Sequence, residues 1–278
     1  MYHPTKIQTK TIIIKSDSPN LTRHSESDVT FSLPETIEIK SNSHCLIAVT
    51  QATIPCTFWM VDYRSDKLVL SGTTFTLGQG NYDADEMTAH LNTLLTGYTV
   101  TYSNIRNMIT ISHSNSFTID ASSTCLHLLG FTSAQVGASA TNHEGANQVD
   151  FSGVNAVDLL VKGLHTGTIN TNFADDDIVA RIPIDVIQKE GPILQYNPEM
   201  PARLLLPNFS IDELRVVLAD ESGDHNLVFH GGAWTIVIEL QIVHSPRDPK
   251  ISNMKTEENR IKNILSNKKN GVNRQKNK

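Results

Sequence analysis

The sequence WTIVIELQIV, residues 234–243, alternates large apolar side chains with other residues over its whole length. Trp234, Ile236, Ile238, Leu240 and Ile242 occupy every second position, and successive side chains of an extended chain point to opposite faces. The intervening positions hold Thr, Val, Glu, Gln and Val. The stretch therefore predicts a β-strand with one face in a hydrophobic core.

The same period of two recurs around residues 29–33 and 214–218, and residues 44–55 form another long strand candidate. Shorter candidates at 157–161, 178–186 and 192–196 are separated by turn-rich segments. Many short strands with turns between them favour a mainly β sandwich. The predicted core consists of Val29, Phe31, Leu33, Leu214, Val216, Leu218, Trp234, Ile236, Ile238 and Leu240.

The middle of the chain has a different pattern. We expect strands at 75–77, 98–102, 108–112 and 117–120, a helix at 83–95, and a short helix that closes at residues 128–130. Residues 133–147, rich in Ala, Ser, Gly and Asn, predict a loop that returns to the sandwich. The predicted divisions are N-terminal sandwich strands at 1–65, an inserted small α+β domain at 66–131, C-terminal sandwich strands at 132–246, and a basic tail at 247–278.

The segment GQGNYDADEM, residues 78–87, places two glycines before the predicted helix, where a phosphate-binding loop would lie. The third glycine of a dinucleotide-binding motif is absent, and so is the Gly-Lys-Ser/Thr of a loop that binds a nucleoside triphosphate. Asp83, Asp85 and Glu86 at the helix start would repel a phosphate. We predict instead a turn followed by a capping box in which Asp83 is the N-cap and Glu86 its partner.

Three other segments contain residues suited to chemistry, and each has a simpler structural interpretation. Asp175, Asp176 and Asp177 are consecutive, which is not the alternate spacing of a calcium loop, and predict an exposed loop. Residues 220–225, DESGDH, lie between two strands and predict a hairpin turn. Residues 230–234, HGGAW, resemble a glycine-rich oxyanion loop, but the chain has no Gly-X-Ser-X-Gly motif to accompany it.

No catalytic, cofactor-binding or metal-binding residues are therefore assigned, and we expect a protein that is not an enzyme and needs no cofactor. Cys45, Cys56 and Cys125 are odd in number and lie in largely apolar sequence, which predicts buried free thiols. No apolar run has the length of a signal-peptide core or of a membrane span, so we expect synthesis in a cytoplasm-like compartment.

Charge is distributed unevenly along the 278 residues, whose net charge is −6. Residues 247–278 contain ten Lys or Arg and three acids, a charge of +7, so the first 246 residues carry −13. Basic tails of this composition interact electrostatically with anionic partners or serve only to solubilise the chain. Both interpretations of the tail remain open.

The order of several short motifs is similar to that of penton and other minor capsid proteins of virophages, polinton-like viruses and related large DNA viruses. In the C-terminal half these motifs are IPI at 182–184, GPILQY at 191–196, IDELRVVLADE at 211–221 and FHGGAWTIVI at 229–238. Upstream, ATIP at 52–55, GNY at 80–82, LLGF at 128–131 and DFSG at 150–153 also fit. The chain departs from the family at His230-Gly231, where Asn-Gly is common, and at Phe151, where Leu is common.

This resemblance implies a single jelly-roll of two four-stranded sheets in a structural virion protein of an icosahedral double-stranded DNA virus. It also implies a homopentamer that contacts the major capsid protein, located in the virion and made in the host cytoplasm or a viral factory. The tail would contact other minor capsid proteins or, as the weaker expectation, the genome. The resemblance does not separate a penton from another minor capsid component. A jelly-roll module that binds a carbohydrate or receptor remains the alternative, and a jelly-roll enzyme would need a cluster that the sequence lacks.

Overall fold

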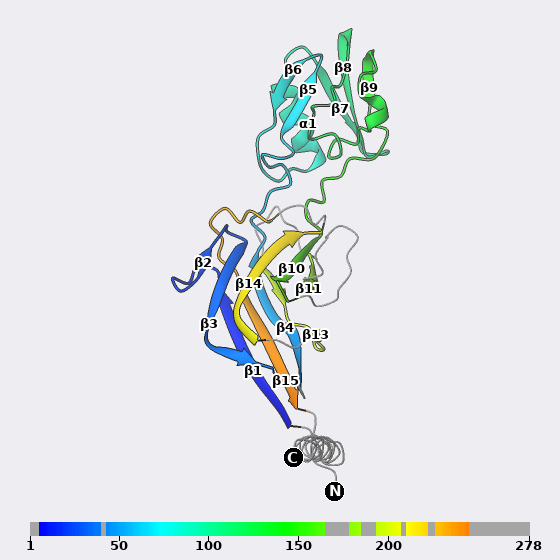
Figure 1. Cartoon of the computed structure of the whole chain (residues 1–278). Helices are drawn as coiled ribbons and strands as arrows, with labels where there is room; N and C mark the ends of the chain where they lie inside the picture. The colour runs from blue at the N-terminus through cyan, green and yellow to red at the C-terminus, as the bar shows by residue number, and fades with distance from the viewer. Residues whose placement is uncertain are drawn as a thin grey trace, which may run out of the picture.

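The computed structural model describes residues 6–39, 43–164, 178–184, 193–206, 210–221 and 226–244. Figure 1 shows an elongated molecule in which a β-sandwich carries a separate module at one end. The predicted tail at 247–278, Asp175–Asp177 and most of the 220–225 turn lie outside the described residues.

The first sheet of the sandwich, sheet A, has the strand order β1-β15-β4-β12, with β13 also paired to β4. Every pairing in it is antiparallel. The first and last described residues of the sandwich, Lys6 and His244, are partners in the ladder between β1 and β15. The strand bounds are β1 Lys6–Lys15, β4 Ser43–Pro55, β12 Ile193–Tyr196, β13 Leu204–Leu206 and β15 Thr235–His244.

The second sheet, sheet B, has the order β11-β10-β14-β3-β2 and is also antiparallel. Its strand bounds are β2 Thr22–Arg23, β3 Asp28–Glu38, β10 Ala156–Lys162, β11 Ile178–Pro183 and β14 Ser210–Asp220. The chain passes repeatedly between the sheets, so that β1, β4, β12 and β15 belong to sheet A while β3, β10, β11 and β14 belong to sheet B. This strand order is that of a single jelly-roll.

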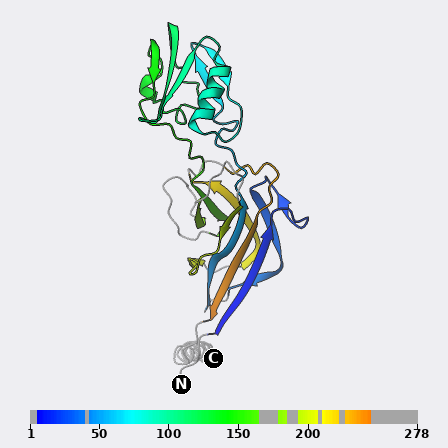
Figure 2. The same ribbon diagram turned by 180° about the vertical axis from the view of Figure 1, so that it is seen from behind.

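The module comes from the connection between β4 and β10. It contains the hairpin of β5 Lys67–Leu70 and β6 Thr73–Thr76, the helix α1 Ala84–Leu94, and the sheet of β7 Thr99–Ser103, β8 Met108–Phe117 and β9 Ala140–Glu144. A short 3₁₀ helix, η1, spans Ser133–Gln135. Figures 1 and 2, seen from opposite sides, both place the module at the end of the sandwich away from the start of β1 and the end of β15.

Two large sets of buried side chains support these parts, and a third, small set lies on the outward side of sheet B. One fills the space between the two sheets, with Trp234 and Phe229 as its largest fully buried side chains. The other surrounds α1 and extends from Met60 to Val149. The range 66–131 for an independently folding insert stays a prediction, and the second core draws on residues on both sides of that range.

The predicted sandwich core is buried at Val29 and at every predicted position of β14 and β15. Phe31 and Leu33 are only partly buried, because β3 lies at an open side of the sandwich. Each sheet has five described strands rather than four, since the short strands β2 and β13 add to them.

Several sequence predictions were wrong in detail. Residues 133–147 contain η1 and β9 rather than a loop, and β9 forms through its ladder with β8 although its sequence, ATNHE, is polar. Residues 126–130 form turns instead of a closing helix. Phe117 ends β8, and Ile119 makes single bridges to Leu70 and Val136 instead of belonging to a strand.

Five strands, β1, β2, β5, β9 and β13, were not predicted, and one connection was misassigned. β14 and β15 belong to different sheets, so the 220–225 segment is not a hairpin turn between them. The chain does reverse there, because Ala219 and Asn226 form an antiparallel bridge before the chain crosses to sheet A.

Candidate assembly surfaces

The glycine-rich turn before α1 has its polar groups occupied by the module itself. The Gly78 N–H donates to His90 Nε2 at 2.9 Å, and the Tyr82 hydroxyl donates to the Gly78 carbonyl at 2.8 Å. Gly80 and Val61 exchange two backbone hydrogen bonds of 3.0 Å each. Burial, with a smaller contribution from Glu86, raises the pKa of Tyr82, so its hydroxyl remains a donor. The turn therefore closes the base of the module and offers no phosphate cradle.

The predicted capping box at the start of α1 is confirmed. Asp83 accepts a hydrogen bond from the Glu86 N–H at 2.8 Å, and Glu86 accepts one from the Asp83 N–H at 3.1 Å. Both acids are thus engaged with the backbone at the helix N-terminus, and Met87 and Leu91 on the opposite side of α1 are buried.

The HGGAW segment also serves the fold. The carboxylate of Glu26 accepts hydrogen bonds from the N–H groups of Phe229 and Gly231 at 2.7 and 3.0 Å. The Trp234 indole donates to the Glu26 carbonyl at 2.8 Å. A carboxylate of the chain itself therefore occupies the position where an oxyanion would have to bind.

His230 and Trp59 join this segment to the connection that leads from β4 into the module. His230 has a positive φ of 46°, and its ring stacks on Trp59 with centroids 3.6 Å apart. A Cβ at Gly232 would lie 2.8 Å from Pro55 Cγ, so the chain passes β4 at a distance that only glycine permits. These contacts fix the point where the chain leaves the sandwich for the module.

The three cysteines are free and buried, as predicted. Burial raises the pKa of Cys45 to about 11 and that of Cys125 to about 12, which disfavours the reactive thiolate. Within the described residues, no group of three or more His, Cys, Asp or Glu is arranged to hold a metal ion. In the same part of the chain, no helix is long and apolar enough to cross a membrane.

The outer face of sheet B carries two bidentate ion pairs. Arg215 makes a bidentate ion pair with Asp28, at 2.9 and 2.7 Å, and Arg181 makes one with Asp158, with both distances 2.7 Å. The hydrogen bonds to these acids raise the pKa of each arginine. Glu213 and Lys162 follow the same outward alternation of side chains. The same side of the sheet also carries a small apolar cluster that is buried, formed by Leu160, Ile178, Val217 and Ala219.

The outer face of sheet A differs. Its outward positions are filled mainly by Ile, Val, Leu, Thr and Gln, and its charged residues are Lys15 and Glu239, the latter paired with Arg203 at 3.0 Å. The exposed large apolar side chains on this face are Ile7 and Ile13 of β1, Ile193 of β12 and Leu205 of β13, with exposed fractions of 58–59%. These side chains lie on β1 at one edge of the sheet and on β12 and β13 beyond β4, with Thr, Val, Glu and Gln at the outward positions of β15 between them.

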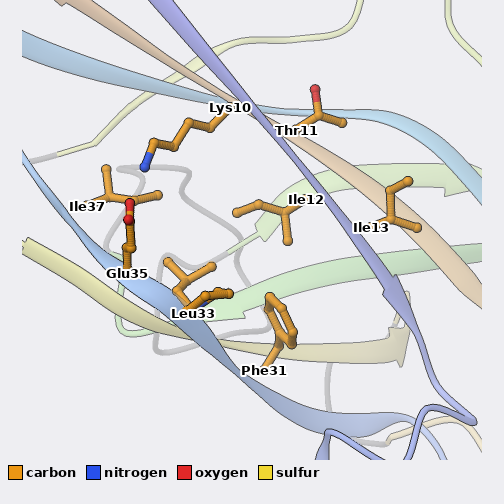
Figure 3. A pocket seen from close by; sticks show the side chains of 9 residues that line it. Lys10, Thr11, Ile12, Ile13, Phe31, Leu33, Glu35 and Ile37 are labelled. Carbon is orange, nitrogen blue, oxygen red and sulfur yellow. The ribbon is translucent and has the colours of Figure 1, made fainter.

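A groove opens at one side of the sandwich, between β1 of sheet A and β3 of sheet B. Its volume is about 500 Å³. Figure 3 shows Ile12, Phe31 and Leu33 pointing into the space between the strands, with Lys10 extending toward Glu35 and Ile37. Sequence reasoning did not find this groove, because β1 was not predicted as a strand.

The fold defines the chain as a single jelly-roll protein with a module inserted between two strands of the sandwich. Neither the protein-family models nor the curated proteins include a match. One solved structure, described as the crystal structure of SeMet-labeled mavirus penton protein, aligns with a TM-score of 0.41 and 9% identity. The alignment covers 87% of this chain and 100% of that chain.

Proposed function

We propose that the chain is a structural virion protein, the penton or a similar minor capsid protein of an icosahedral double-stranded DNA virus. Its copies assemble into pentamers that contact the major capsid protein. The order of short motifs that resembles penton and minor capsid proteins supports this proposal, as does the single jelly-roll with its inserted module. Two of the chemical motifs considered in the sequence, the glycine-rich turn before α1 and the HGGAW segment, have polar groups that are hydrogen-bonded within the fold.

The observation that carries the assembly role is the contrast between the two outer sheet faces. The apolar side chains on the outward side of sheet B are buried, whereas sheet A exposes Ile7, Ile13, Ile193 and Leu205 to solvent. In a closed ring, each copy makes heterologous contacts and needs two different side surfaces. We assign the outer face of sheet A to one of these contacts.

The two ends of the elongated molecule differ, so the proposed capsomer would have a distinct outer end and base. The module lies at one end of the sandwich, and the start of β1 and the end of β15, which pair with each other, lie at the other. With the module outward, both ends of the sandwich chain are near the base, where the major capsid protein would be contacted. The tail at 247–278 would then start at the base as well.

The test is the mass of the purified full-length protein in solution, measured by light scattering during size exclusion. A pentamer supports the proposal. A monomer that binds sugars on a glycan array would favour the carbohydrate- or receptor-binding alternative and would contradict the assembly role. Electron microscopy of the oligomer would show whether the modules of all copies lie at the same end, as the proposed orientation requires.

A further inference from the structure

The groove between β1 and β3 is bounded by two strand edges without partners among the described residues. β1 pairs on one side with β15, and β3 pairs with β14 and, near Val29 and Thr30 alone, with β2. From Phe31 to Glu38, the other edge of β3 faces the groove side of the sandwich. Free strand edges present unpaired N–H and C=O groups and are sites where another strand adds.

The side chains of the groove indicate what kind of chain would fit. Ile12, Leu33 and Phe31 supply an apolar floor, and Lys10 points inward in the same alternation as Ile12. Lys10 is partly buried and forms no ion pair with a described residue. Glu35 lies exposed at the rim. An extended peptide with apolar side chains, an acid for Lys10 and a base for Glu35 would match these features.

We propose that this groove binds the C-terminal segment, residues 245–278, of a neighbouring copy of the chain. This inference rests on the proposed assembly and deepens it by naming the contact. The segment has apolar residues within a polar sequence, and it has Glu257 and Glu258 among its basic residues. The segment therefore contains the apolar, acidic and basic side chains that would match the groove. Its charge of +7 is opposite in sign to the −13 of the preceding residues.

The position of His244 explains why a neighbour is the recipient. β15 runs away from the module and ends beside Lys6, four residues along β1 from Lys10 at the groove wall. A segment that continues in the direction of β15 leaves its own sandwich, and it would have to reverse to enter its own groove. The 34 residues after His244 could extend about 110 Å, which is ample to reach an adjacent copy.

The test is cysteine cross-linking in the full-length protein. Leu33→Cys on the groove wall is combined, in separate variants, with Ile251→Cys, Ile261→Cys or Leu265→Cys in the C-terminal segment. The control replaces Leu33→Cys by Ser32→Cys, the adjacent residue of β3, which is exposed and does not line the groove. The native cysteines are buried, and wild-type protein measures their background. Thr11→Cys with the control Thr9→Cys provides a second pair on β1, should Leu33→Cys disturb folding.

We expect at least one segment cysteine to give disulfide-linked multimers on a non-reducing gel with Leu33→Cys. The yield should exceed that of Ser32→Cys about tenfold or more, because docking raises the local concentration above that of a free tether. Equal yields for groove and control positions, no cross-link at any position, or a bond within single chains would each overturn the inference. Light scattering of the same variants shows whether pentamers form. Pentamers without cross-links would contradict the groove contact alone, whereas the absence of pentamers would contradict the proposed function.

Discussion

Ile238 and Val237 are adjacent in β15, and substituting each in turn tests folding and assembly separately. A change at Ile238 should affect folding, and a change at Val237 should affect the proposed contact between copies. Ile238 points between the sheets, is fully buried, and pairs with Ile12 of β1 and Val49 of β4. Val237 points to the outer face of sheet A and is partly exposed. Ile238→Asp and Val237→Asp thus introduce the same side chain on opposite faces of one strand.

The expected costs differ by several kcal/mol. Ile238→Asp removes about 1.5–3 kcal/mol of apolar burial and leaves a carboxylate that costs several kcal/mol more to bury without a partner. The sum approaches the whole free energy of unfolding of an ordinary domain, about 5–15 kcal/mol. A milder series calibrates the site, since Ile238→Val should cost about 0.5–1.5 kcal/mol and Ile238→Ala about 2–5 kcal/mol. Val237→Asp should cost at most about 1 kcal/mol.

The assay is urea unfolding followed by the fluorescence of Trp234, in a Trp59→Phe background so that the sandwich core alone is reported. Trp234 is fully buried and lies next to the strand that is changed. Size exclusion with light scattering then measures the oligomer formed by each folded variant. We expect Ile238→Asp to be unfolded, and Val237→Asp to be folded but monomeric.

Two results would refute the reasoning in different places. A folded Ile238→Asp with a wild-type urea midpoint would mean that the inward side of β15 is misassigned. A folded Val237→Asp that forms the wild-type oligomer would remove the outer face of sheet A from the contacts between copies. The jelly-roll topology would stand in the second case and the proposed interface would not.

Three further substitutions or measurements test other parts of the structure. Glu26→Gln weakens the charged hydrogen bonds to the Phe229 and Gly231 N–H groups, and we expect a loss of about 1–2 kcal/mol in the same unfolding assay, with Asp17→Asn as an exposed control. Gly130 has φ +77° and its Cβ would lie 2.3 Å from the Asn147 carbonyl oxygen, so Gly130→Ala should loosen the inserted module. Hydrogen exchange should then rise in α1 while β15 keeps its protection; an equal rise in both would contradict a separately folding insert. The raised pKa values of Cys45 and Cys125 predict no reaction with a thiol reagent at pH 8 until urea unfolds the protein. Because the unfolded thiols ionise near pH 9.0 and the folded ones do not, the stability they contribute is complete below pH 9 and declines as the pH rises toward 11. A urea midpoint that does not fall over this range, or that falls equally in Cys45→Ala, would contradict the assignment for Cys45.

The sequence predicts best where one strand has one buried face. In β14 and β15 the large apolar residues keep to one side, so the fold class and the burial of Val216, Ile236 and Ile238 follow from alternation. The start of α1 is equally predictable, because the capping box depends on side chains within three residues of one another. Strand order is not local in this sense. The pairing of Lys6 with His244 joins the two ends of the described chain, and no periodicity specifies it.

Within the module, the missed strands lack the signals on which sequence reasoning depends. β5 is four residues long and its last three are buried, so it shows a short apolar run without alternation. β9 is polar, and His143 is its one buried side chain. Its ring contacts Phe117 edge-on at 4.6 Å, and its Nε2 lies 3.0 Å from the Phe117 carbonyl oxygen. Tertiary pairing with β8, rather than propensity, makes this segment a strand.

The failure to predict β1 has a different cause, and it bears on function. Ile12, Ile13 and Ile14 are consecutive, so the alternation is hidden by an isoleucine that points outward and is 59% exposed. Lys10 is a second departure from the alternation, because it is a charged residue at a position where the strand points inward. The exposed isoleucine is explained if β1 is covered in the assembly, whereas an inward lysine is one of the ways in which an edge strand avoids pairing with another sheet. Ile13 then contributes to the outer face of sheet A and Lys10 to the groove, so the strand that alternation failed to identify carries residues of both proposed contacts.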